Sequence, residues 1–296
     1  QIKILDPACG SGAFPIGLMQ LLIKTLDRLT AYYDPSIEKF RLGKPNEKND
    51  LYLTKLFLIK NTLYGSDLEP MAIEISKLRA WLSLIVDDSG DVEPLPNLDF
   101  NFVCANSLIH LSGTEDNVEQ MNLFNTDTFE DDFEMLRRKF FNTHSREEKD
   151  KLKKQFIDLI NGQLSEAGNT YRAKQLKSWN PFLSDKPALF FDRKFMFNIQ
   201  DGFDIVIGNP PYIHFEDMKE DSKKLYKPLS YYQSYEARGD IYTLFYELGL
   251  QNLKQNGILC YITSNKWMRA GYGESLRDNV FYKNAIVNLH FAIFLQ

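Results

Sequence analysis

The stretch that decides the fold opens the chain: Ile2-Lys-Ile-Leu5, followed by Asp6-Pro-Ala-Cys-Gly-Ser-Gly12. The short apolar run predicts a buried strand, and the glycines after it predict a tight turn where the backbone can approach a ligand. The apolar segment Phe14–Leu29 predicts a helix, with Pro15 in its first turn, where proline is tolerated. A strand, a glycine turn and a helix in this order are typical of the ligand-binding edge of an open α/β sheet. The turn lacks the third glycine of the dinucleotide fingerprint, which disfavours a nicotinamide cofactor.

Strands and helices then alternate on both sides of a central insertion. Before it we expect, in order, a helix, a strand, a helix and a strand: Leu51–Lys60, Thr62–Tyr64, Pro70–Ile85 and Phe100–Cys104. After it we expect a strand, a helix, a strand, a helix and a last strand: Phe203–Ile207, Asp240–Lys254, Gly257–Thr263, Glu274–Val280 and Ile286–Phe294. This alternation predicts an α/β fold with a Rossmann-like, doubly wound and mostly parallel sheet. The polar stretch Tyr32–Asp50 reads as a loop.

The alternation stops between about Leu111 and Asn198. One helix is predicted by apolar residues at helical spacing: Phe129, Phe133, Leu136 and Phe140. A second helix opens at a capping box of Ser145 and Glu148 and is expected to end at Asn161-Gly162. We therefore predict an inserted helical hairpin, and we interpret its mixed charges as a solvated face rather than a DNA-binding helix. The expected division is 1–110, a mainly helical insertion at 111–200, and 201–296.

Composition narrows the class of protein. The 296 residues are 44% hydrophobic and 25% charged, which suits a globular domain with a sizeable core. No apolar run is long enough to span a bilayer and no signal peptide opens the chain, so we expect a cytoplasmic location and no membrane partner. Three cysteines and four histidines are scattered, which predicts neither a disulfide framework nor a metal site.

The net charge of −5 is unusual for a protein that binds nucleic acid. Contacts to phosphates supply much of the affinity for DNA, and they require a basic face. Any such face must be local, or it must lie on another part of the protein.

Polar residues follow the second and third predicted strands. Asp67 is placed where an acidic residue can accept hydrogen bonds from ribose hydroxyls. The alternative is an acid that stabilises the N-terminus of the helix beginning at Pro70. Asn106-Ser107, after the third strand, could contact the adenine of a nucleoside cofactor or could form a turn.

Asn209-Pro-Pro-Tyr212 ends the buried strand at Phe203–Ile207. Two successive prolines fix the backbone and remove two amide donors, so the segment presents carbonyl acceptors, a side-chain amide and an aromatic ring. This set suits a planar substrate with an exocyclic amino group: Asn209 and Pro210 could accept its two hydrogens, and Tyr212 could stack on the ring. The alternative is a rigid turn with a surface tyrosine.

Together these segments resemble the adenine-N6 DNA methyltransferases. Residues 6–12 are similar to their motif I, residues 64–84 to the motif II region, and Asn209-Pro-Pro-Tyr212 to the catalytic motif IV. Residues 205–212, 239–245 and 257–267 resemble the methylase region of fused type IIG restriction-modification enzymes. The order of motifs I and IV resembles the gamma class. The resemblance covers most of the chain except the helical insertion.

The resemblance implies S-adenosyl-L-methionine as cofactor and a flipped adenine in DNA as substrate. It implies that 1–110 is the cofactor-binding half and 201–296 the catalytic half of one methyltransferase domain. It implies cofactor contacts at seven positions: Asp6, Ala8, Gly10, Gly12, Asp67, Leu68 and Asn106. The family often has Asp at the last of these. The catalytic residues it implies are Asn209, Pro210 and Tyr212.

Several points differ from the family's pattern. We expect no motif X helix before motif I in this chain, and Phe294 is the candidate for a second base-stacking aromatic. We expect a separate or missing target-recognition domain, and we find no nuclease motif. Two other functions stay open: methylation of a protein glutamine amide, and a non-catalytic nucleic-acid-binding subunit.

The segment after the catalytic motif suggests a contact with DNA. Tyrosines alternate there with basic residues, in the set Lys223, Lys224, Tyr226, Lys227, Tyr231, Tyr232, Tyr235 and Arg238. Aromatic and basic side chains together suit stacking on bases and contact with the backbone. Packing of the tyrosines on the core is an equal alternative.

Overall fold

The computed structural model describes residues 2–32, 50–86, 98–112, 126–143, 145–167, 171–226 and 232–282. The chain forms two compact units, which are described separately below. The first comprises Gln1–Gly208 and Asn252–Cys260, and the second comprises Asn209–Gln251 and Tyr261–Gln296. The predicted division at 110 and 200 stays a prediction.

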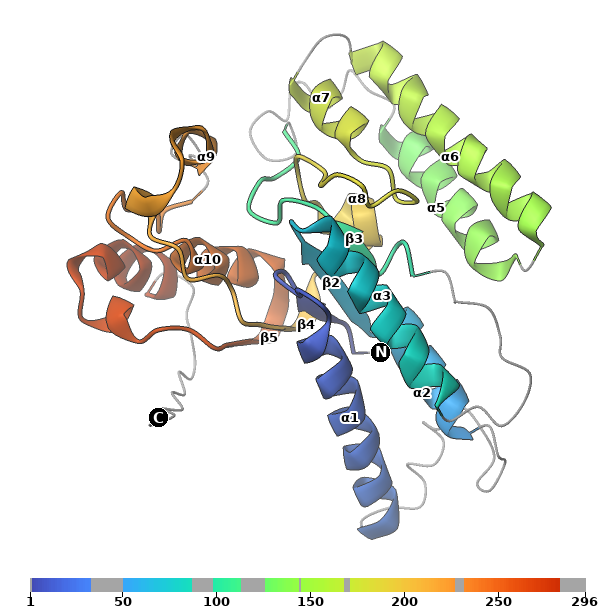
Figure 1. Cartoon of the computed structure of the whole chain (residues 1–296), viewed down its shortest axis with the longest axis horizontal. Helices are drawn as coiled ribbons and strands as arrows, with labels where there is room; N and C mark the ends of the chain where they lie inside the picture. The colour runs from blue at the N-terminus through green and yellow to red at the C-terminus, as the bar shows by residue number, and fades with distance from the viewer. Residues whose placement is uncertain are drawn as a thin grey trace. The chain divides into compact units, whose positions relative to one another are not determined.

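A five-stranded sheet in the order β3-β2-β1-β4-β5 organises the first unit (Figure 1). The strands are β1 Ile4–Asp6, β2 Leu63–Asp67, β3 Phe102–Cys104, β4 Phe203–Gly208 and β5 Leu253–Tyr261. The central strand β1 pairs in parallel with β2 and β4, and β2 pairs in parallel with β3. The doubly wound α/β sheet is therefore confirmed. The strand order reverses between β1 and β4, which is where ligands bind in open α/β sheets, outside the carboxyl ends of the strands.

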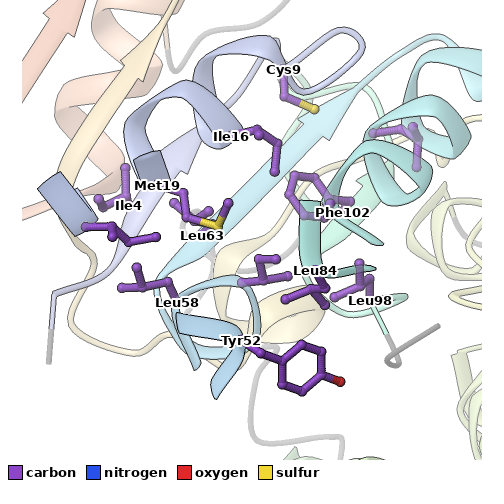
Figure 2. Packing of buried hydrophobic residues seen from close by; sticks show 14 of the residues in the cluster. Ile4, Cys9, Ile16, Met19, Tyr52, Leu58, Leu63, Leu84, Leu98 and Phe102 are labelled. Carbon is purple, nitrogen blue, oxygen red and sulfur yellow. The ribbon is translucent and has the colours of Figure 1, made fainter. Parts of the chain in front are cut away.

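Three helices cover part of this sheet: α1 Ala13–Tyr32, α2 Asp50–Asn61 and α3 Pro70–Ile85. Their apolar faces meet the buried side chains of β1, β2 and β3 in one cluster, shown in part in Figure 2. Ile4, Met19 and Leu63 belong to it and are at most 2% exposed. The helices and strands of this half lie within three residues of their predicted bounds. The predicted loop at Tyr32–Asp50 falls almost entirely outside the described residues.

The insertion contains α5 Thr126–Asn142, α6 Arg146–Ala167, α7 Tyr171–Ser178 and α8 Arg193–Phe197. Helices α5 and α6 lie side by side, as a hairpin requires (Figure 1). The Ser145 hydroxyl accepts the Glu148 N–H at 3.5 Å, at the predicted start of α6. The predicted end at Asn161-Gly162 is wrong, because α6 continues to Ala167. A glycine within a helix costs only about 1 kcal/mol relative to alanine, and buried side chains such as Phe156 and Ile160 stabilise the helix before that point.

An aromatic cluster joins the insertion to the sheet. The ring of Phe100, two residues before β3, lies against phenylalanine rings whose centroids are 5.3–6.3 Å away, among them Phe133, Phe140, Phe156 and Phe182. The buried Arg137 guanidinium lies 5.4 Å from the centre of the Phe100 ring. The hairpin therefore shares a core with the sheet and presents its remaining charges to solvent. The side chain of Phe129 lies outside the described part.

The second unit is built from short elements. They are η2 Phe215–Asp217, α9 Glu220–Tyr226, α10 Tyr242–Asn252, η3 Lys266–Met268, η4 Gly271–Gly273 and the π-helix η5 Leu276–Phe281. Tyr242, Trp267, Leu276 and Val280 form its apolar cluster. Helix α10 ends two residues before its predicted end, and β5 begins four residues before its predicted start. The predicted strand Ile286–Phe294 lies outside the described residues.

None of the helices that the structure describes is long and apolar enough to cross a membrane. The same residues contain no cluster of three His, Cys, Asp or Glu side chains that could hold a metal ion.

We predict that Gly65→Ala destabilises the protein by about 1–3 kcal/mol, the usual cost of overpacking a core. A Cβ at Gly65 in β2 would lie 2.9 Å from both Cys9 Sγ and Phe102 Cδ1. Gly162→Ala in α6 is the matched control, because a Cβ there meets nothing within 4 Å, and alanine should stabilise that helix by roughly 0.5–1 kcal/mol. Chemical denaturation measures both changes, and equal effects of the two variants would contradict the packing argument.

Candidate cofactor and substrate site

The turn between β1 and α1 has the backbone that its glycines predict. Gly10 and Gly12 have φ angles of +52° and +78°, in the left-handed region where other residues are strained. A Cβ at Gly12 would lie 3.0 Å from the Ser76 hydroxyl of α3, so this glycine also permits a close approach between the turn and that helix. A Cβ at Gly10 meets nothing within 4 Å, so the backbone there faces open space.

Hydrogen bonds from three other segments hold the turn. The Gly10 N–H donates to Asp67 Oδ2 at 2.8 Å, and the Ser76 hydroxyl donates to the Gly10 carbonyl at 2.8 Å. The Ser107 hydroxyl donates to the Pro7 carbonyl at 2.6 Å. The turn is thus fixed by groups that follow β2 and β3 and by the helix α3.

The sequence analysis missed Ser66 and Ser76 as members of this network. The Ser66 hydroxyl lies 2.9 Å from that of Ser107, and the Ser66 carbonyl accepts the Cys9 N–H at 3.1 Å. Both Ser66 and Ser76 are fully buried. The signal was present at Ser76, which is a polar residue on the apolar face of the helix Pro70–Ile85.

Asp6 carries a buried carboxyl group at the carboxyl end of β1. Its Oδ1 accepts the Ala8 N–H at 3.1 Å, and its buried Oδ2 has no hydrogen-bond partner within the described part of the chain. Burial raises the pKa of this carboxyl to about 7; the Ala8 hydrogen bond opposes the rise and the nearby Asp67 carboxylate adds to it. A cationic ligand group would relieve both the missing partner and the cost of ionisation.

Asp67 connects the turn to the start of α3. Besides the Gly10 N–H, it accepts the Glu69 N–H on Oδ1 at 2.9 Å, one residue before Pro70. A carboxylate has about four acceptor positions, so hydroxyl donors can still bind. The geometry therefore accommodates both the ribose interpretation and the helix-start interpretation. The neighbouring Leu68 is 52% exposed, as a residue that covers a ligand ring would be.

Asn106 forms a turn after β3. Its Oδ1 accepts the Leu108 N–H at 3.2 Å, and its own N–H donates to the Ala188 carbonyl at 2.9 Å. The structure thus supports the turn interpretation directly, and the contact with a cofactor adenine stays a proposal.

The second unit begins with the predicted catalytic motif, because Asn209 directly follows β4. The Tyr212 hydroxyl lies 3.0 Å from Asn209 Oδ1 and 2.8 Å from the Ile262 carbonyl, and it can donate to either oxygen. The Tyr212 ring is half exposed and lies 5.9 Å from the Tyr242 ring. Burial raises the pKa of the Tyr212 phenol above its ordinary value of 10.

A short antiparallel pairing holds the residues after this motif. The Ile241 N–H donates to the Ile213 carbonyl at 3.0 Å, and His214 forms an isolated bridge with Asp240. The His214 Nδ1 lies 3.3 Å from the buried Asp240 Oδ1. Sequence analysis did not predict this pairing, because two segments about 27 residues apart carry no local signal for it.

In the predicted DNA-contacting loop, several described lysines and tyrosines already contact other residues of the protein. Lys223 and Lys224 form ion pairs with Glu220 and Asp221 at 3.2 Å and 3.6 Å. Three of its aromatic residues pack inward or on a neighbour: Tyr226 and Tyr232 are buried, and Tyr235 lies 4.9 Å from the Phe215 ring. The core-packing alternative thus describes these tyrosines, and the DNA contact stays a prediction. Lys227, Tyr231 and Phe294 lie outside the described residues.

Comparison with known proteins identifies the family. The sequence model of the Eco57I restriction-modification methylase family matches residues 61–292. The chain belongs to this family. The resemblance to the methylase region of restriction-modification enzymes is therefore confirmed.

Individual relatives agree with this assignment. The putative type II restriction enzyme and methyltransferase RM.MjaORFECS2P of Methanocaldococcus jannaschii is 36% identical over 161 residues, which are 52% of this chain and 12% of the relative. The type II restriction enzyme and methyltransferase RM.Eco57I of Escherichia coli is 26% identical over 285 residues, 93% of this chain and 21% of the relative. The type II methyltransferase M.PaeR7I of Pseudomonas aeruginosa is 40% identical over 78 residues, 26% of this chain and 13% of the relative. The chain thus spans at most about a fifth of these relatives.

We predict that the ionisation of Asp6 makes the stability of the unliganded protein depend on pH. Its pKa is about 7 in the folded protein and ordinarily 3.8, so the folded state retains a proton that the unfolded state loses. Between these values each pH unit should remove up to about 1.4 kcal/mol from the free energy of unfolding, with no further loss above pH 7. Asp6→Asn, measured by denaturation from pH 4.5 to 8, should lack this component. Parallel curves for the two proteins would show that folding does not raise the pKa of Asp6.

Proposed function

We propose that this chain is the catalytic region of a DNA methyltransferase that transfers a methyl group from S-adenosyl-L-methionine to the N6 amino group of adenine, within a restriction-modification system. One observation carries the proposal: Asn209-Pro-Pro-Tyr212 follows β4, the strand that pairs with β1, and β1 runs into the glycine turn. Membership of a restriction-modification methylase family supports methyl transfer to DNA. Adenine as the target rests on the chemistry of the motif.

The residues of the first unit fit the cofactor. The unpartnered Asp6 Oδ2 suits the ammonium group, and the open space at Gly10 admits a ligand next to the turn, which Ala8 and Gly12 complete. Asp67 would bind the ribose hydroxyls, and the adenine would lie against Leu68 and near Asn106. The bound cofactor supplies a methyl group that its sulfonium already activates. The protein then contributes mainly position and orientation.

The catalytic motif fits a flipped base. A base inside a duplex is out of reach, so the adenine has to leave the helix. The Asn209 Oδ1 and the Pro210 carbonyl would accept the two N6 hydrogens and stabilise the positive charge that develops there. The Tyr212 ring would stack on the base.

The tyrosine hydroxyl adds a detail to this proposal. It can donate to Asn209 Oδ1, the same acceptor that the base requires, and the Ile262 carbonyl is a second acceptor for the same proton. When the base amino group donates to Asn209, the Tyr212 hydroxyl can therefore keep a partner by donating to Ile262. The hydroxyl proton of Tyr212 therefore has an acceptor in either state.

A protein glutamine amide presents a similar planar amino group, so the same motif could accept it. The two substrates are separated by incubating the full-length protein with methyl-labelled cofactor, DNA and cell protein. Label in N6-methyladenine supports the proposal, and label confined to protein overturns it.

We predict that Asn209→Ala reduces single-turnover methylation by roughly a hundredfold or more, the scale for losing one transition-state contact. Cofactor affinity, measured by calorimetry, should stay near that of the wild type, because Asn209 is placed at the base and not at the cofactor. Full methylation rates in this variant would remove Asn209 from the mechanism.

We predict that Tyr212→Phe keeps most activity, because the ring is retained and only the hydroxyl is lost. Tyr212→Ala should weaken the hold on the flipped base by about 1–3 kcal/mol, the usual value of one base–aromatic stack. Single-turnover rates over a range of DNA concentrations separate this loss from a loss in the chemical step. If both variants lose activity equally, the hydroxyl and not the ring is what matters.

A further inference from the structure

The segment 171–194 has an excess of positive charge in an otherwise acidic chain. It contains six Lys and Arg residues and two Asp residues, whereas the whole chain has a net charge of −5. It runs from the start of α7 into α8. The excess of positive charge is therefore local. A chain with a net negative charge needs such a local basic region if it is to bind a polyanion.

Four lysines of this segment are exposed: Lys174, Lys177, Lys186 and Lys194. On α7 the buried residues are Ala173, Gln175 and Leu176, so the two lysines of that helix lie on its outer side. None of the four forms an ion pair with another residue in the described ranges of the chain. Their charges are therefore available to a ligand.

The segment is fixed at a defined place on the sheet. The Ala188 N–H donates to the Cys104 carbonyl at 2.9 Å, and the Phe191 N–H donates to the Ile109 carbonyl at 2.7 Å. The Gln175 side chain of α7 donates to the His110 carbonyl at 2.9 Å. These bonds tie the lysine-bearing segment to the residues that follow β3, beyond its carboxyl end. The proposed cofactor site lies at the same edge of the sheet.

Two other lysine-bearing helices, α6 and α9, have equal numbers of basic and acidic residues. Helix α6, Arg146–Ala167, has five basic and five acidic residues, and Lys153 covers the Phe182 ring. The lysines of α9 are paired with acids of the same helix. The segment 171–194 thus differs from α6 and α9 in having six basic residues and only two acidic ones.

We propose that Lys174, Lys177, Lys186 and Lys194 form a surface that binds the phosphate backbone of duplex DNA during methylation. This inference rests on the proposed function for the identity of the partner. It moves the contact from the loop after the catalytic motif to the insertion, where the sequence alone suggested only a solvated face. Lysines act on phosphates as point charges, so this surface would hold DNA without selecting its sequence.

The test compares two double variants of the full-length protein that lose the same charge: Lys174→Gln/Lys177→Gln on α7, and Lys151→Gln/Lys154→Gln on α6 as control. The control residues are also exposed lysines three positions apart on a helix. Fluorescence anisotropy with a duplex of unrelated sequence gives the dissociation constant at several salt concentrations. Each lost phosphate contact should reduce the slope of log K against log salt by about 0.9. The α7 variant should therefore lose up to about 2 in slope and roughly tenfold in affinity at low salt, and the control should match the wild type.

The outcomes separate this inference from the proposed function. Adenine methylation at saturating DNA should be unchanged in the α7 variant, since its lysines are not placed at the reacting atoms. A wild-type slope in the α7 variant, or an equal loss in the control, would overturn the surface while leaving the methylation result intact. If the wild type methylates no adenine but the α7 variant still loses slope, the proposed function fails and the anion-binding surface stands. A second pair, Lys186→Gln/Lys194→Gln, tests the rest of the surface in the same way.

Discussion

The hydrogen bond from the Gly10 N–H to the Asp67 carboxylate joins residues 57 positions apart, and the geometry of the glycine turn after β1 depends on it. It forms only when β1 and β2 are paired in register, because Gly10 lies in the turn after β1 and Asp67 is the last residue of β2. Once formed, it fixes a glycine in a left-handed conformation that offers backbone and open space to a ligand. Ser76 and Ser107 fasten the same turn from two other directions. The sheet thus acts as a frame that preorganises a loop, and a preorganised loop loses little entropy on binding.

The turn contains one group that is unsatisfied. Folded proteins leave few buried polar atoms without a partner, and those that persist often mark a site of function. Asp6 Oδ2 is such an atom, at the end of the central strand and beside the point where the strand order reverses. Its burial is costly in the absence of a ligand, and a cation is the kind of group that removes the cost. In the proposed site, the same residue would weaken the empty protein and strengthen the complex.

The insertion shows how a large added segment can be kept rigid. The ring of Phe100 is the centre of an aromatic cluster that includes residues of both helices of the hairpin. Backbone bonds from Ala188 and Phe191 then return the chain to the edge of β3. Side chains on the outside are free to carry charge because packing alone fixes the helices. This separation allows an acidic protein to have a local basic surface.

The sequence by itself determined the doubly wound sheet, the glycine turn and the motif at the end of β4. These features have local signals: apolar runs of strand length, glycines at a turn, and a rigid pair of prolines. The start of α6 could also be predicted, from a capping box, whereas its end could not, since one glycine within a helix costs only about 1 kcal/mol. The tertiary structure alone decided that Ser66 and Ser76 belong to the hydrogen-bond network of the glycine turn and that His214 pairs with Asp240. It also decided which of the described lysines form ion pairs. The physical reason is the same in each case: these contacts join residues that are distant in the chain, and their free energy depends on burial and register that no local pattern records.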